Sequence, residues 1–194
     1  MNHEQLLAFI KKYGNISELE EESIKTFFVP LLIKKKQVLI EKNTVCNKLF
    51  FVNKGLLRTY YIDINGNEFT RRIAWENGFL TNMSSFRKNG IENNETIECI
   101  ENAEILQITK IDLDKLLSLS ADLTKIYQII LEKYMAINIR RYQHLSSSSP
   151  LEKLIYFNEN YPLLKSRIND TILASFLSIS RKTLIRTKKQ LIKK

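Results

Sequence analysis

The segment 170–193, DTILASFLSISRKTLIRTKKQLIK, constrains the fold more than any other part of the chain. Its pattern predicts a short helix from about Thr171 with Asp170 as N-cap, a turn near Ser178, and a second helix capped by Ser180. This layout is that of a helix-turn-helix. The expected inward faces consist of Ile172, Leu173, Phe176 and Leu177 in the first helix and of Leu184 and Leu191 in the second.

The second of these helices is strongly basic. Residues 181–194 contain seven Lys or Arg and no acidic residue. The phosphate backbone of duplex DNA is the natural partner of such a field. A solvated face or a frayed basic tail would explain the charge equally well, but it would not explain a capped helix in front or an apolar residue in the turn. The pattern therefore favours a DNA-reading helix-turn-helix.

The positive charge of the chain is concentrated in its C-terminal quarter. The formal net charge is +9. Residues 146–194 hold ten Lys or Arg against three acids, whereas residues 1–145 hold twenty against eighteen. With 44% apolar residues the chain can bury a core. A basic module on a near-neutral body indicates that one end binds nucleic acid and the other has a different role.

Few residues are available for metal or redox chemistry. Cys46, Cys99, His3 and His144 are too few and too scattered for a zinc or iron-sulfur site, so we expect no cofactor and no metal. Residues 31–108 contain no histidine, which argues against a jelly-roll metal enzyme, and we expect no catalysis. The chain opens without a secretory leader and has no apolar run of transmembrane length, so we expect a cytoplasmic protein.

The region 31–108 carries a period of two, in short β-branched and aromatic runs separated by turn residues. Asn65-Gly66 is the strongest hairpin signal in the chain, Gly55 marks a second turn, and 96–108 reads as a closing hairpin. Strands at this spacing without helices between them predict an antiparallel β-roll or jelly roll.

Helices flank this region on both sides. The stretch up to Phe28 reads as helical, with a capping box of Ser17 and Glu20 and an end at Pro30. After the strands, a long helix is expected over residues 120–145. Its two apolar stripes can pack on the roll or on a second copy, and they fit plain core as well as a dimer seam. The stripes are Leu119, Leu123, Ile126, Ile130 and Ile137, and beside them Tyr127, Leu131, Tyr134 and Asn138.

Residues 146–150, SSSSP, have nothing to bury and read as a hinge or linker. A further helix over 151–161 would pack under the helix-turn-helix. The predicted domains are therefore 1–119 for the β-roll with its flanking helices, 120–145 for the long helix and 146–194 for the helix-turn-helix.

In this order of parts, the chain resembles the CRP/FNR family of bacterial transcription regulators. The most specific stretches are 49–58, 62–68 and 179–186. The resemblance implies an α+β fold with an N-terminal antiparallel β-roll, a long dimerisation helix and a C-terminal winged-helix-like helix-turn-helix domain. It further implies a homodimeric, sequence-specific DNA-binding regulator that pairs through the long helix, binds an inverted-repeat operator and can contact RNA polymerase.

The resemblance also assigns roles on the recognition helix. Where the family has an arginine, an acid and a second arginine, this chain has Arg181, Lys182 and Arg186, the expected base-reading residues. Lys182 departs from the family's acid, so the preferred half-site should differ at that base pair. Ser178 departs from the glycine that is common in the turn. The expected phosphate contacts are Ser180, Thr183, Lys188 and Lys189.

The sensor region departs further from the family. Its cyclic-nucleotide binders use a Gly-Glu pair for the ribose and an Arg followed by a small hydroxyl residue for the phosphate. Segments 78–90 and 93–96 stand at these places here and contain neither that Glu nor that Arg, so cyclic nucleotides are not expected to bind. Arg87 and Lys88 can supply charge from a neighbouring turn, although exposed loop charges explain them equally. The candidate effector pocket consists of Met83, Ser84, Ser85, Arg87 and Thr96.

Two alternatives stay open at this point. The first is a small-molecule-binding β-roll whose helix-turn-helix mediates protein contacts instead of DNA binding. The second concerns the roll itself, which is either a ligand-binding domain or only a scaffold filled with aromatic side chains. The effector, the operator, the regulated genes and the sign of regulation are not specified by the sequence. The aromatic residues expected inside are Phe50, Tyr60, Phe69, Trp75 and Phe79.

Overall fold

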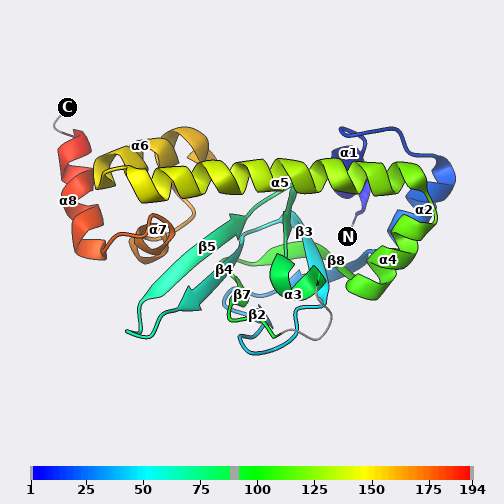
Figure 1. The fold of residues 1–194 in the computed structure, drawn as a ribbon, viewed down its shortest axis with the longest axis horizontal. Coiled ribbons are helices and arrows are strands. Elements are labelled where there is room, and N and C mark those ends of the chain that lie inside the picture. The colour runs from blue at the N-terminus through cyan, green and yellow to red at the C-terminus, as the bar shows by residue number, and fades with distance from the viewer. Residues whose placement is uncertain (1, 88–91, 193–194) are drawn as a thin grey trace. The chain divides into compact units, whose positions relative to one another are not determined.

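The computed structural model describes residues 2–87 and 92–192, and most of its helices and strands are labelled in Figure 1. It divides into two compact units. The first, the roll unit, consists of the chain up to Tyr61 together with Arg71–Glu132, and the second, the helical unit, consists of Ile62–Thr70 together with the chain from Lys133. The long helix therefore contributes to both units. The domain boundaries expected at residues 119 and 145 stay predictions.

Two four-stranded antiparallel sheets form the centre of the roll unit, in the orders β1-β8-β3-β6 and β2-β7-β4-β5. The expected antiparallel β-roll is thus confirmed. The strands are β1 (Val29–Ile33), β2 (Val38–Ile40), β3 (Lys48–Lys54), β4 (Leu57–Ile62), β5 (Glu68–Ala74), β6 (Gly78–Leu80), β7 (Thr96–Cys99) and β8 (Ala103–Thr109).

The turns predicted from the sequence have different roles in these sheets. Asn65-Gly66 joins neighbouring strands of one sheet, β4 and β5, with Gly66 at φ 81°, so this hairpin is confirmed. The segment 96–108 is not a hairpin, because β7 and β8 belong to different sheets. Gly55 likewise carries the chain from one sheet to the other. Its φ of 102° and a Cβ position only 2.7 Å from the Cα of Ala103 leave room for glycine alone.

Alternation along β3 separates the two faces of its sheet. Phe50 lies in the buried cluster between the sheets, whereas Phe51 lies on the opposite face. There it meets its cross-strand partner Phe79 at a centroid distance of 4.9 Å, and Phe9 of helix α1 (Glu4–Ile10) packs on both rings. Of the five aromatic residues expected inside the roll, only Phe50 belongs to that cluster, whose other members are aliphatic residues and the two cysteines.

Helix α2 (Glu18–Phe27) begins with the predicted capping box of Ser17 and Glu20. Phe27 is its last helical residue and Phe28 its C-cap, as expected for a helical stretch up to Phe28, and Pro30 lies within β1. Two short helices, α3 (Met83–Arg87) and α4 (Lys110–Ser118), complete the roll unit.

Helix α5 (Ala121–Ser147) follows Ser120, whose Oγ accepts hydrogen bonds from the backbone N–H groups of Asp122 and Leu123. Leu123, Ile126 and Ile130 are buried in the roll unit, so this part of the first predicted stripe is core. Leu119 and Ile137 of that stripe are exposed. Across the described residues, no helix combines the length and apolarity needed to cross a membrane.

The serine-rich segment is shorter as a linker than the sequence predicts. Ser146 and Ser147 form the last residues of α5, and Ser149 caps α6 (Pro150–Asn160) in a capping box with Glu152. Only Ser148 and Ser149 therefore separate the two helices. The chain continues through η1 (Pro162–Leu164), α7 (Asp170–Phe176) and α8 (Arg181–Ile192), and the described residues 150–192 contain no strand, so no β-wing accompanies the helix-turn-helix there.

Candidate nucleic-acid interface

The helix-turn-helix begins one residue earlier than the sequence predicts. Asn169 is the N-cap of α7, and its Oδ1 accepts a hydrogen bond of 2.9 Å from the N–H of Ile172. Asp170 was the expected cap, but it is the first helical residue and its carboxylate pairs with the ammonium of Lys188 in α8. Asn and Asp are equally good N-caps, so the sequence alone does not decide whether Asn169 or Asp170 is the cap. In the structure the carboxylate of Asp170 is engaged by Lys188, and Asn169 is the cap.

The turn between the helices uses a left-handed backbone at Ser178, with φ 53°. The reversal is held by a 3.1 Å hydrogen bond from the N–H of Ile179 to the carbonyl of Ala174. As expected, Ser180 then caps α8, since its Oγ accepts a 3.0 Å hydrogen bond from the N–H of Thr183. Ser178 thus adopts the left-handed conformation for which glycine is common at this turn, and a side chain there costs some backbone strain.

One face of α8 is buried and fixes the rotation of the helix. Leu184 is 0% exposed and Thr187 is 2% exposed, with Leu191 half-buried one turn on. Thr187 was not predicted to be buried because it is polar. Its hydroxyl donates a 2.9 Å hydrogen bond to the carbonyl of Thr183, four residues earlier. These residues lie within about 60° of one another around the helix axis.

The opposite face carries the expected DNA-contacting residues. Arg181, Lys182, Arg186 and Lys189 are all exposed and, at 3.6 residues per turn, fall within an arc of about 140° that excludes the buried face. Ser180 is exposed and Thr183 is half-buried, both at the N-terminal end of the helix. Lys188 is half-buried at the edge of this arc, where it pairs with Asp170. The structure thus places six of the seven predicted side chains at one end or on one face of α8, whereas Lys188 is paired with Asp170.

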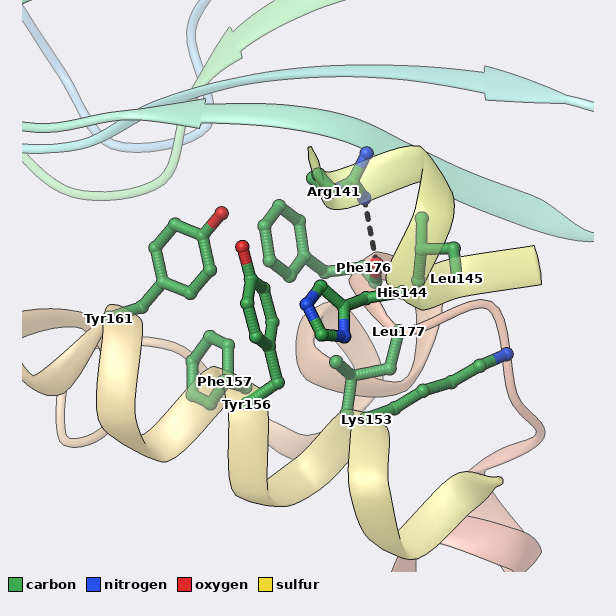
Figure 2. Close-up of a pocket in the computed structure, with 9 residues that line it drawn as sticks. All are labelled: Arg141, His144, Leu145, Lys153, Tyr156, Phe157, Tyr161, Phe176 and Leu177. Carbon is green, nitrogen blue, oxygen red and sulfur yellow. Dashed lines mark hydrogen bonds between the residues drawn. The ribbon is translucent and has the colours of Figure 1, made fainter. Parts of the chain in front are cut away.

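A buried polar junction holds the helix-turn-helix to other parts of the helical unit (Figure 2). The guanidinium of Arg141, from α5, donates a 2.7 Å hydrogen bond to the carbonyl of Phe176, shown dashed in Figure 2, and lies 4.2 Å from the centre of the Phe176 ring. It also donates a 3.1 Å hydrogen bond to the carbonyl of Thr70. Ser175 Oγ accepts a 2.6 Å hydrogen bond from the N–H of Thr70 and donates one of 2.8 Å to the Thr70 hydroxyl. Thr70, Arg141 and Ser175 are all buried. We call this group the Arg141 junction, and it joins α5, α7 and the tip of the β4–β5 hairpin.

Beside the junction, aromatic side chains close the space between α5, α6 and α7 (Figure 2). The ring of His144 stacks on Tyr156 at 3.8 Å, and Phe176 meets the rings of Phe157 at 6.0 Å and Tyr161 at 5.4 Å. The cavity left among them has a volume of about 10 Å³, which is room for about one water molecule. This aromatic group is therefore a packed joint that supports α7, and it is too small to hold an effector.

The region of the expected effector pocket contains a buried carboxylate. Glu95 is 3% exposed, and its two oxygens accept hydrogen bonds from Arg71 Nη1 at 2.7 Å and from Asn82 Nδ2 at 2.6 Å. Ser85 Oγ accepts a 2.8 Å hydrogen bond from the N–H of Cys46. The sequence did not reveal the group of Glu95, Arg71 and Asn82, because no neighbouring residue marks Glu95 as a partner of a residue on β5.

The other predicted pocket residues are spread over different environments. Met83 is half-buried, Ser84 and Arg87 are exposed, and all three lie on α3. Thr96 is half-buried at the start of β7, directly after Glu95. Lys88, the alternative source of charge, lies outside the described residues. The buried polar side chains of Asn82, Ser85 and Glu95 thus already have hydrogen-bond partners within the roll unit.

Comparisons with known proteins agree with this geometry. Residues 30–120 match the family model described as "Cyclic nucleotide-binding domain". A structure from Eubacterium rectale assigned to the CRP/FNR family superimposes with a TM-score of 0.70 at 17% identity, over 90% of this chain and 83% of that one. The chain has the CRP/FNR fold.

Further structures share the CRP/FNR fold at similarly low identity. FixK2 from Bradyrhizobium japonicum gives a TM-score of 0.73 at 10% identity, over 86% of this chain and 85% of that chain. CLP, the c-di-GMP-responsive global regulator of Xanthomonas campestris, gives 0.73 at 15% identity, over 90% and 91%. No curated protein sequence matches the chain. At these identities the CRP/FNR likeness describes the fold, and the roles of individual residues rest on the geometry given above.

Proposed function

We propose that this protein is a homodimeric, sequence-specific DNA-binding transcription regulator of the CRP/FNR type, without catalytic activity and acting in the cytoplasm. The observation that carries the proposal is the division of α8 into two faces. Leu184 and Thr187 pack one face against the rest of the helical unit, and the opposite face presents exposed basic side chains. The helix contains no Asp or Glu. Such a helix presents its cations to a duplex without rotating or unfolding.

Base recognition is assigned to the exposed end of α8. Arg181 and Arg186 can each donate two hydrogen bonds to the O6 and N7 atoms of a guanine in the major groove. Lys182 donates a hydrogen bond where related helices carry an acceptor, so it favours an acceptor on the base edge instead of the amino group of cytosine. Lys189, Ser180 and Thr183 are assigned to phosphates. Lys188 is a phosphate contact only if it leaves Asp170.

Dimerisation is assigned to the second half of α5. Met135, Ile139 and Tyr142 follow a four-three spacing and are 63%, 55% and 59% exposed, which is unusual for three large apolar side chains in line. We call them the α5 seam. Pairing two seams would remove this apolar surface from water and would present two copies of α8 to successive major grooves about 34 Å apart. The operator is therefore expected to be an inverted repeat, and RNA polymerase is a further partner consistent with regulation.

The roll unit is assigned a role other than cyclic-nucleotide binding. Glu95 places a buried negative charge between Arg71 and Asn82, and a cyclic phosphate brought beside it would meet a like charge in a poorly hydrated site. The carboxylate and the phosphate would compete for the same Arg71 guanidinium. An effector, if one regulates this protein, belongs to another chemical class.

Selection of bound sequences from a random duplex pool, with purified protein at physiological salt and no added ligand, tests the proposal. Recovery of a palindromic motif is the expected result. The salt dependence separates this function from the alternative of a protein-binding helix-turn-helix, because affinity through six or more phosphates falls by about 10³ or more between about 50 and 200 mM salt. Failure to bind any duplex at low salt would refute DNA binding.

A further inference from the structure

The tip of the β4–β5 hairpin is acidic and lies beside the helix-turn-helix. Residues 62–70 contain Asp63 and Glu68 and no Lys or Arg. By its contacts this segment belongs to the helical unit, although β4 and β5 continue into a sheet of the roll unit. The rest of the helical unit, residues 133–194, holds thirteen Lys or Arg against three acids, so the hairpin tip is an acidic element in a unit of net positive charge.

The hairpin tip and the base-reading end of α8 form two walls of one open cleft of about 460 Å³. Asn67, Glu68 and Phe69 form the hairpin wall, and the opposite wall includes Ser180 and Arg181. A duplex that brings a base edge to Arg181 therefore also brings its phosphates toward the hairpin.

A second carboxylate, that of Asp63, lies in the turn of the hairpin and is hydrogen-bonded to Asn67 of this wall. Asp63 accepts hydrogen bonds from the N–H groups of Asn65 (2.9 Å) and Asn67 (2.8 Å) and from the side chain of Asn67 (3.1 Å). The side-chain hydrogen bond from Asn67, followed by its backbone N–H, holds the pKa of the Asp63 carboxyl below its usual value. The carboxylate is thus ionised at neutral pH and held next to the residues that line the cleft.

The hairpin is also fixed in this position. Thr70, at its base, exchanges two hydrogen bonds with Ser175 of α7 and accepts a third from Arg141. All three residues are buried, so the hairpin tip is attached through the Arg141 junction to the helix that precedes the turn.

We propose that the hairpin tip is an autoinhibitory element, whose carboxylates stand in the path of DNA phosphates at the N-terminal end of α8. The inference rests on the proposed DNA-binding function. Duplex binding then competes with the docked hairpin, and any event that loosens the Arg141 junction raises the affinity for DNA. The acids do not select a sequence, so they lower affinity for every duplex.

Removing one carboxylate tests this directly. Glu68→Gln keeps the size of the side chain, and Glu159→Gln, at an exposed position of α6, makes the same change in net charge away from the cleft. Binding of a fluorescently labelled random duplex is measured by anisotropy at several salt concentrations, with circular dichroism to verify folding. Glu68→Gln is expected to tighten binding about threefold at low salt, as follows from one charge a few ångströms from a phosphate in water, and by more than Glu159→Gln does.

Equal effects of the two substitutions, or no effect of Glu68→Gln while the wild-type protein binds DNA, would overturn the autoinhibitory role and leave the proposed function intact. Absence of binding by all variants at low salt would defeat both. Binding gained by Glu68→Gln alone would support both. Asp63→Asn, which keeps one oxygen to accept the two backbone hydrogen bonds of the turn but loses the acceptor for the Asn67 side chain, provides a second variant with the same expected direction.

Discussion

Replacing Arg141 with methionine should destabilise the helical unit strongly. Methionine keeps most of the aliphatic volume but removes the hydrogen bonds to the carbonyls of Phe176 and Thr70 and the contact with the Phe176 ring. Hydrogen bonds from a charged donor are worth about 1.5 to 3 kcal/mol each, and a desolvated cation–π contact up to about 2 kcal/mol. Relief of the buried charge offsets part of this loss, so we expect a net cost of about 3 kcal/mol.

Urea unfolding, followed by circular dichroism at 222 nm, measures the loss, and Arg140→Met is the matched control because Arg140 is the exposed neighbour on the same helix. The single tryptophan, Trp75, reports on the roll unit and should shift less than the helical signal. If Arg141→Met costs no more than Arg140→Met, the junction does not stabilise the unit and the reasoning fails.

Four other outcomes are expected. Arg186→Ala should cost about 1 to 3 kcal/mol on the selected operator in a titration, and an equal loss on random DNA would contradict base reading. Ser178→Gly should raise the free energy of unfolding by about 0.5 to 1 kcal/mol, because glycine adopts the positive φ without steric cost. An unchanged urea midpoint would contradict this. Tyr142→Glu should shift the protein toward monomer in sedimentation velocity, and an unaltered dimer would exclude the α5 seam. Burial raises the pKa of the Cys99 thiol to about 11, so a thiol reagent at pH 8 should label it only after unfolding, and rapid labelling of the native protein would refute its burial.

Features fixed by neighbouring residues could be predicted from the sequence. The Asn65-Gly66 hairpin and the capping box of Ser17 and Glu20 depend on a few consecutive residues, and both are present. The end of α5 was predicted too early, because a run of serines resembles a linker in composition. In the helix, the hydroxyls of Ser146 and Ser147 are satisfied by carbonyls one turn back, so composition alone was misleading.

Features that depend on distant residues could not be found in this way. Glu95 has an ordinary sequence context, and only the fold brings Arg71 and Asn82 to its carboxylate. Arg141 lies 35 residues from Phe176 and 71 from Thr70 along the chain, and no local pattern connects them. The exposed face of α8 was predictable because helical periodicity is local, whereas the contacts that hold this helix in position are not.

The Arg141 junction also bears on how this protein can be dissected. A fragment that begins at residue 146 would contain the whole helix-turn-helix but neither Arg141 nor Thr70. Ser175 would lose its partner in the hairpin, and the carbonyl of Phe176 would lose its guanidinium donor. Truncation at an apparent linker would therefore remove part of the interior of the unit that it was meant to isolate, and DNA affinities measured on such a fragment would describe a different molecule.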